Sequence, residues 1–177
     1  MPSGKTHDTI TFLLAVPTFA AAYAVSRSPA ESVIVAAAFT FGGLMFGPDL
    51  DTVSRQYSRW FIFRFLWYPY RSFFKHRSRF SHGLVFGALI RVVYFMGIVT
   101  LVAFLAAYIY AAYSGGKLPG IVAFARFWQP LTETMSLRLG DHFFLFGFIG
   151  LWLGAASHTF TDLAGSFIKT GRVAKFL

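Results

Sequence analysis

The chain has 177 residues and a formal net charge of +9 at pH 7, and 56% of its residues are hydrophobic while only 13% are charged. A soluble domain carries about 25% charged residues, so this composition excludes an ordinary water-soluble protein and predicts an integral membrane protein. The chain contains no cysteine, which excludes disulfide bonds, thiolate metal sites and cysteine nucleophiles. A chain of this length is expected to form one membrane domain, residues 1–177.

Four stretches are long and apolar enough to cross the hydrocarbon core of a bilayer, which takes about 20 helical residues. They lie near residues 8–26, 32–48, 84–113 and 142–163. The sequence therefore predicts an all-α fold, an integral membrane four-helix bundle surrounded by membrane lipids.

The first and third stretches each carry an unusual feature. Residues 22–24 (Ala-Tyr-Ala) resemble the cleavage site of a secretory signal, but cleavage would remove His7, so we expect the first helix to be retained. Arg91 lies inside the third stretch, and a lipid-facing arginine at mid-membrane costs roughly 3 kcal/mol or more. We therefore expect Arg91 to face the bundle interior or the membrane interface.

Between the second and third stretches, residues 55–75 mix arginines with aromatic side chains. Aromatic rings favour the headgroup zone, where cations also meet anionic lipid. The pattern predicts an interfacial amphipathic segment, broken into two short helices at Pro69. A solvated basic loop would explain the arginines but not the aromatic residues. Nucleic-acid-binding proteins also combine basic and aromatic residues, but the hydrophobic context favours a membrane, and we expect no nucleic-acid partner.

The positive charges predict the orientation. With four crossings, the N-terminus, residues 49–82 and the C-terminal tail share one side of the membrane, and this side carries most of the lysines and arginines. The other side carries only Arg27, Lys117, Arg126 and Arg138. The positive-inside rule therefore predicts a multi-pass protein of the cytoplasmic (inner) membrane with both termini in the cytoplasm.

Four of the five histidines and four of the seven acidic residues flank the predicted helices on this cytoplasmic side. A chain with so few of these residues has little reason to place them at one depth unless they bind something, and we expect a metal ion. The candidate metal ligands are His7, Asp49, Asp51, His76, His82, His158 and Asp162. The remaining pair, Asp141 and His142, falls on the outer side and is expected to lie outside the site.

Spacing supports some of these candidates directly. His158 and Asp162 are four residues apart and share one helix face, so they can chelate one ion, or the carboxylate can orient the imidazole. Asp49 and Asp51 follow a helix end, where two like charges and the helix dipole repel one another unless a cation intervenes. Each motif also has an ordinary structural explanation, such as a buried His–Asp hydrogen bond or a solvated turn. Their conjunction is what predicts a metal site.

The ligand types restrict the metal. Imidazole and carboxylate without sulfur suit Zn, Mn or Fe, and imidazole argues against Mg or Ca alone. Seven candidate ligands exceed the four that one tetrahedral zinc ion uses. The sequence therefore predicts a divalent transition metal, with Zn first and Mn or Fe as alternatives, in a cluster of two or three ions.

Three motifs carry a resemblance to a known family. Residues 1–8 (MPSGKTHD), 41–51 (FGGLMFGPDLD) and 76–83 (HRSRFSHG) resemble a bacterial family of uncharacterised metal-binding membrane proteins. That family is related to the predicted membrane-bound metal-dependent hydrolases, which share a His, a Pro-Asp-x-Asp, a His-Arg with Ser-His, and a late His-x-x-x-Asp. The ligand order is more distantly similar to zinc-dependent phospholipase C, an all-helical trinuclear phosphodiesterase, although this chain lacks the full ligand count and crosses the membrane.

The resemblance implies a membrane-embedded metal-dependent hydrolase. Its substrate is expected to be a phosphoester in a lipid or lipid-linked molecule, reached at the cytoplasmic membrane face. Asp51 or Asp8 is expected to act as general base or bridging ligand. Arg77, close in sequence to two of the candidate histidines, is expected to bind a phosphate with Arg79.

Two other classes of function use similar ligands. A non-catalytic metal-binding protein (a transporter, a sensor or a structural protein) would hold the ion without reacting, and a transporter would also carry polar residues through mid-membrane. A haem-binding bundle would need paired axial histidines without accompanying aspartates. The sequence favours the hydrolase over both, and it does not predict an oligomeric state.

Overall fold

The computed structural model describes residues 3–74 and 78–171, and every regular element in these ranges is a helix. This confirms the predicted all-α class. The long helices are α1 (Gly4–Ser26), α2 (Pro29–Met45), α6 (Phe86–Tyr113), α7 (Ile121–Leu139) and α8 (Phe143–Thr170). Five short elements lie between α2 and α6: the 3-10 helices η1 (Pro48–Asp51) and η2 (Phe61–Trp67), and the α-helices α3 (Arg55–Arg59), α4 (Tyr68–Phe73) and α5 (Arg79–His82).

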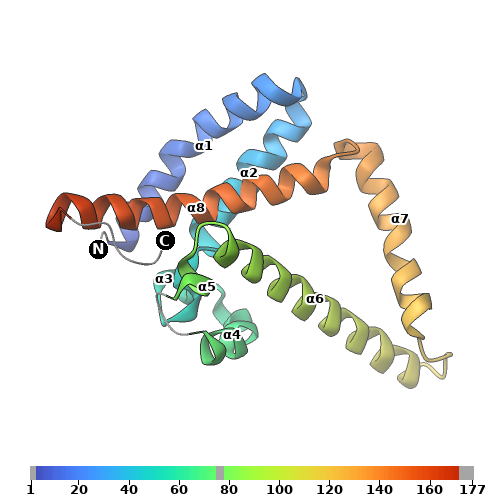
Figure 1. Ribbon diagram of the computed structural model, residues 1–177. Coiled ribbons are helices and arrows are strands. Elements are labelled where there is room, and N and C mark those ends of the chain that lie inside the picture. The colour runs from blue at the N-terminus through green and yellow to red at the C-terminus, as the bar shows by residue number, and fades with distance from the viewer. Residues whose placement is uncertain (1–2, 75–77, 172–177) are drawn as a thin grey trace.

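Helices α1, α2 and α8 pack side by side and form the centre of the molecule (Figure 1). Helix α6 touches this centre near its beginning and then runs away from it, and α7 leads back from its far end to the start of α8 (Figure 1). The structure thus differs from the expected four-helix bundle, because only three of the four apolar helices pack along their length. The central stretch of α6 buries none of its residues within the protein.

Glycines determine how closely α2 and α8 approach. A Cβ atom on Gly154 would lie 2.0 Å from the Phe39 carbonyl oxygen, and one on Gly150 would lie 2.3 Å from that of Val35. Neither position can hold a larger side chain without separating the backbones. Gly150 and Gly154 are four residues apart, the small-xxx-small spacing that brings membrane helices together.

Local signals set the ends of α1 and α2. The Ser3 hydroxyl accepts a hydrogen bond from the Thr6 amide at 3.2 Å and caps α1, so this helix begins before the predicted residue 8. Arg27 adopts a left-handed conformation with φ 56° and ends α1. Ser28 then caps α2, with Pro29 in its first turn. The two helices therefore form a hairpin with almost no loop.

Helix α7 is absent from the elements that the sequence predicts. It is amphipathic, with Arg126, Glu133 and Arg138 interrupting its apolar residues. Because of these charges, the segment has no run of about 20 apolar residues that could cross a bilayer. Composition alone therefore predicts a connection between two membrane helices here and does not predict a helix.

The segment expected to be interfacial folds into three short helices, because η2 connects α3 to α4. Pro69 lies in the first turn of α4, where its missing N–H costs nothing. Trp67 and Tyr70 are buried in an aromatic core with Phe46 at the end of α2. Other aromatic residues on the same segment, including Phe61 and Phe73, remain largely exposed. One side of the segment thus anchors it to the helices, and the other presents aromatic rings outward.

Arg91 is buried, with 1% of its surface exposed. Its Nε donates to the Phe46 carbonyl at 3.0 Å, and its Nη1 donates to the Ser81 carbonyl. The side chain thus joins the start of α6 to the end of α2 and to α5. The expectation that Arg91 faces the interior is confirmed.

Within the described ranges, four helical segments are long and apolar enough to cross a membrane: α1, α2 extended through η1, α6 and α8. They correspond to the four predicted stretches. By length and composition the chain is suited to a membrane.

The contact between α2 and α8 generates a prediction. Replacing Gly154 with Ala forces a methyl group into the Phe39 backbone, and we expect a loss of about 1–3 kcal/mol in the free energy of unfolding. A Cβ atom added to Gly97 of α6 would meet no atom of the described residues within 4 Å, so Gly97→Ala is the matched control and should not destabilise. Thermal unfolding in detergent measures both. Equal stability of the two variants would show that the helices do not meet at Gly154.

Candidate metal centre

Two helices from opposite ends of the chain bring three predicted ligands together. His7 lies near the beginning of α1, and His158 and Asp162 lie one turn apart on α8. One nitrogen or oxygen atom from each of the three residues lies within 4.8 Å of the other two, and all three residues are buried. His7 Nε2 is 3.2 Å from Asp162 Oδ1, and the His7 and His158 rings stack with centroids 3.7 Å apart. These three residues are called the His–His–Asp cluster below.

The close approach of α2 and α8 places this cluster. His158 follows Gly154 by one helical turn, so it lies against α2 just beyond the contact. On α1, Thr11 lies one helical turn after His7 and packs on Gly43 of α2. The Thr11 hydroxyl donates to the His7 carbonyl at 2.9 Å, which satisfies it within its own helix. Gly43 is therefore the point where all three helices meet.

Asp49 connects the cluster to a second group of ligands. Its Oδ2 is 3.4 Å from His158 Nε2, and its Oδ1 is 3.5 Å from His82 Nε2. The two oxygens of one carboxylate thus face two different imidazoles. This arrangement is suited to a carboxylate that bridges two ions.

His82 is fully buried and is held from its other side. Its Nδ1 lies 3.0 Å from the Ser81 hydroxyl and 3.5 Å from Asp51 Oδ2. Asp51 therefore lies behind the ring, away from Asp49. The sequence predicted Asp51 as a ligand and general base, whereas this geometry suits a carboxylate that orients His82 and leaves Nε2 directed at the site.

Gln56 of α3 holds His158 in the same way. Its Nε2 donates to the Gly43 carbonyl at 2.9 Å and lies 3.1 Å from His158 Nδ1. The amide thereby fixes the ring plane and turns Nε2 toward Asp49 and Asp162. Gly47 leaves room for this amide, because a Cβ there would lie 2.3 Å from Gln56 Nε2.

The chemistry of the cluster fits a transition metal. His158 Nε2 and both carboxylate oxygens of Asp162 are buried without a hydrogen-bond partner among the described residues. Buried polar atoms are rarely left in this state, because each costs roughly 1–3 kcal/mol. Ligand atoms bound tetrahedrally at about 2.1 Å lie about 3.4 Å from one another, close to the spacings seen here. One cation between these atoms would satisfy all of them.

A small cavity opens beside the cluster. Its volume is about 140 Å³, and its lining includes the metal-ligand candidates His7, Asp49 and His158 together with Arg55 and Arg59. Asp8 also lines it, and its Oδ2 is held by Arg59 Nη2 at 2.5 Å and Arg55 Nη1 at 3.0 Å. Asp8, predicted as a base, is thus paired with two arginines.

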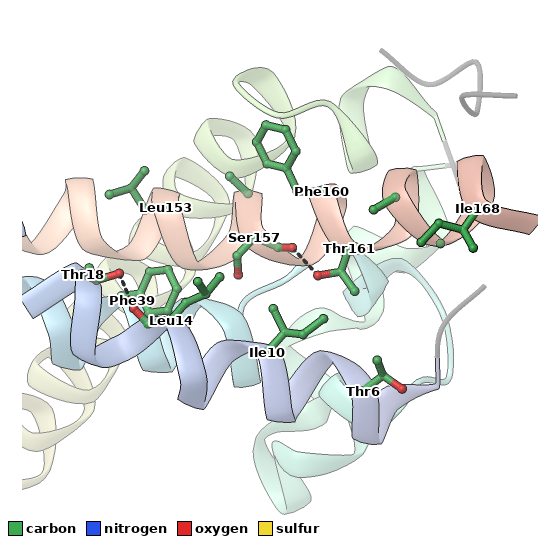
Figure 2. A pocket seen from close by; sticks show the side chains of 13 residues that line it. Thr6, Ile10, Leu14, Thr18, Phe39, Leu153, Ser157, Phe160, Thr161 and Ile168 are labelled. Carbon is green, nitrogen blue, oxygen red and sulfur yellow. Dashed lines mark hydrogen bonds between the residues drawn. The ribbon is translucent and has the colours of Figure 1, made fainter. Parts of the chain in front are cut away.

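A larger apolar groove lies between α1 and α8 (Figure 2). Figure 2 shows Ile10 and Leu14 of α1 on one side and Leu153, Phe160 and Ile168 of α8 on the other. The groove encloses about 630 Å³, and its lining includes Thr6 and Thr161, the neighbours of two cluster residues. Its hydroxyls bond within their own helices, as Thr161 does to the Ser157 carbonyl at 2.8 Å. The groove surface is therefore apolar despite its serine and threonines.

The structure thus connects five of the seven predicted metal ligands through close pairwise contacts, with Asp51 beside them as a neighbour of His82. The five connected residues are His7, Asp49, His82, His158 and Asp162. His76 and Arg77 lie outside the described residues. Asp141 and His142 lie at the opposite end of α8 from the cluster, as predicted.

Sequence reasoning missed Gln56, Arg55 and Arg59 as residues of the site. The charge of the two arginines pointed to membrane topology and lipid contact, and a glutamine carries no charge to single it out. Their spacing held a usable signal, because positions 55, 56 and 59 share one face of a short helix that follows the two aspartates.

The comparisons with known proteins agree with this site. A family model described as "Uncharacterized metal-binding protein (DUF2227)" matches residues 2–172. No curated protein and no solved structure matches the chain. The predicted kinship with an uncharacterised metal-binding family is confirmed, while the relation to hydrolases stays a prediction. Because the matched region covers nearly all of the sequence, the chain belongs to this family of uncharacterized metal-binding proteins.

Proposed function

We propose that the protein is a membrane-embedded metal-dependent hydrolase that cleaves a phosphoester in a lipid or lipid-linked substrate. One observation carries the proposal: His7, His158 and Asp162 lie close together. Beside them is Asp49, whose two carboxylate oxygens face His158 and His82. The unsatisfied buried atoms of His158 and Asp162 support a resident cation, and the adjacent cavity gives a small group access to it.

Two ion positions fit the ligands best. His7, His158, Asp162 and Asp49 Oδ2 would hold one ion, while Asp49 Oδ1 and His82 Nε2 would contribute to another. The nitrogen and oxygen ligands favour zinc, with manganese or iron as alternatives. A third position would need ligands beyond these five.

The roles of the side chains follow from their contacts. When bound, ions of this type polarise a phosphoryl oxygen as Lewis acids and lower the pKa of water. Gln56 and the pair Ser81 and Asp51 orient the two imidazoles, so that the ligands need little rearrangement. Asp49 is the only one of the five ligands with a partly exposed side chain, at 26%, and it lines the cavity. It is therefore the ligand whose carboxylate a group entering the cavity would meet.

The apolar groove supports a lipid substrate. It passes beside the cluster residues and follows α8 on both sides of Asp162, from Leu153 to Ile168. A second apolar hollow of about 460 Å³ shares Leu14, Phe39 and Leu153 with it and extends it to Val25. An acyl or isoprenoid chain that lies there would be in apolar surroundings like those of the bilayer, and it would hold its phosphate end near the metal ligands.

We place the protein in the cytoplasmic membrane with both termini in the cytoplasm. The bias of lysines and arginines supports this orientation, as does the position of the cluster near the beginning of α1 and in the C-terminal half of α8. The metal centre would then face the cytoplasm.

A non-catalytic metal-binding protein is the second candidate. The burial of the cluster favours it, because Asp162 is only 1% exposed and a fully enclosed ion serves structure or storage as well as catalysis. The two candidates differ in whether phosphoesters are hydrolysed.

The first prediction concerns metal content. Protein purified without chelator should contain at least one transition-metal ion per chain by elemental analysis. His158→Ala should weaken binding by more than the roughly 10–100-fold that loss of an orienting residue causes. His142→Ala is the matched control, because this histidine lies at the far end of α8 and should leave metal content unchanged. A wild-type protein without metal would refute the metal centre.

The second prediction tests the enzyme and its groove together. Metal-loaded protein should hydrolyse long-chain and short-chain phosphoesters. Ala164→Phe places a ring in the groove, where it would collide with a bound chain, so it should lower kcat/KM for the long-chain substrate and change that for the short one little. Leu13→Phe, on an exposed part of α1 outside the groove, is the control. Absence of hydrolysis with every substrate would favour the non-catalytic candidate.

The third prediction concerns orientation, and the lack of native cysteine makes it simple to test. Lys117→Cys lies between α6 and α7, and Lys169→Cys lies near the end of α8. In right-side-out vesicles an impermeant maleimide should label Lys117→Cys at once and Lys169→Cys only after permeabilisation. The reverse labelling pattern would overturn the orientation.

A further inference from the structure

Arg55 and Arg59 present two cations to the cavity that the metal ligands share. We propose that these arginines form a phosphate-binding subsite, and that Asp8 occupies it as an internal anion when no ligand is present. The proposal rests on the proposed function and names the part of the substrate that enters the cavity: a phosphate group, whether from a lipid headgroup or from a soluble phosphoester.

The geometry of the two arginines supports an anion site. Both guanidinium groups converge on one oxygen, Asp8 Oδ2, so they already meet at a single point of negative charge. Arg59 also donates from Nη1 to the Leu44 carbonyl at 2.8 Å, which fixes its direction. Among the described residues Arg55 has only Asp8 as an ion-pair partner, and its side chain is 51% exposed. Arg59 is therefore the fixed half of the subsite and Arg55 the adjustable half.

Charge also favours an anion at this place. Two arginines facing one aspartate leave an excess of one positive charge at the cavity wall. A phosphate group carries up to two negative charges and can accept parallel hydrogen bonds from a guanidinium fork. It would therefore compete with Asp8 for both arginines.

A second carboxylate makes the subsite depend on metal. Asp49 lines the same cavity, and without a cation its carboxylate repels an incoming phosphate. A metal ion held by the cluster would offset this repulsion and attract the phosphate. Because the metal-ligand candidates and the two arginines line one cavity, a single phosphate could then meet the metal ion and the guanidinium groups together.

The size of the cavity matches a phosphate group. Its volume of about 140 Å³ is close to that of an engineered cavity of about 150 Å³ that binds benzene. It can take a phosphate and the first atoms attached to it. The remainder of a substrate must stay outside.

Inorganic phosphate is the probe, and its binding is measured by calorimetry on metal-loaded and metal-free protein. Phosphate should bind the metal-loaded form at least tenfold more tightly, and by linkage it should raise metal affinity by the same factor. Arg55→Gln should weaken phosphate binding roughly tenfold and leave metal content unchanged. Arg64→Ala removes an exposed arginine of η2 that does not line this cavity and is the matched control.

Asp8→Asn should change phosphate affinity in the opposite direction to Arg55→Gln. Removing the internal anion should tighten phosphate binding by up to about tenfold, because the arginines no longer have to release a carboxylate. A merely structural Asp8 would give weaker or unchanged binding. Vesicles that contain a phosphomonoester lipid, compared with a short soluble phosphomonoester, distinguish the two sources of phosphate, since Ala164→Phe should weaken only the lipid.

The outcomes separate this inference from the proposed function. If the wild-type protein holds metal but Arg55→Gln and Asp8→Asn leave phosphate affinity unchanged, the subsite is refuted and the metal centre stands. If the protein holds no metal, the proposed function fails and the subsite fails with it.

Discussion

The backbone contact between α2 and α8 determines where every other part of the site lies. Gly154 lets the two helices approach until no side chain fits between them, and His158 comes one turn later on the same face. Because the helices are so close, the residues that follow α2 reach His158 directly: Asp49 at 3.4 Å and Gln56 at 3.1 Å. Thr11 packs on Gly43 at the same level and brings His7 over the His158 ring. A packing feature made of glycines thus creates a centre made of histidines and aspartates.

The buried polar groups of the protein are arranged in two layers. The inner layer consists of the ligands, among which His158 and Asp162 keep the unsatisfied atoms that a cation would satisfy. The outer layer consists of groups that bond to the ligands or fix the chain that carries them: Gln56, Ser81 and Asp51, and Arg91 through its bonds to the Phe46 and Ser81 carbonyls. Breaking an outer contact would misdirect a ligand without removing it.

The all-α class, the four apolar helices and the candidate residues that lie close together could be predicted from the sequence, because each depends on local composition or on residues that are rare in this chain. The packing of the helices and the directions of the site side chains could not be predicted from the sequence. Helix α6 is apolar on all sides, so its composition is equally consistent with packing in a bundle or standing in lipid. The direction of Asp51 depends on the turn of η1, which places Asp49 and not Asp51 toward His158. The shared helix face of Arg55, Gln56 and Arg59 is a local pattern, but their partners Asp8 and His158 lie on α1 and α8, and the sequence does not indicate which distant residues α3 meets.

The stacking of His7 on His158 has a consequence for folding. One ring belongs to α1 and the other to α8, so a long stretch of chain lies between them. The stack is a long-range contact that can form only when α8 has packed on α1 and α2, and such contacts are slow to form because a long loop must close first. Partly folded states in which α8 is still apart would leave the three residues of the His–His–Asp cluster separated.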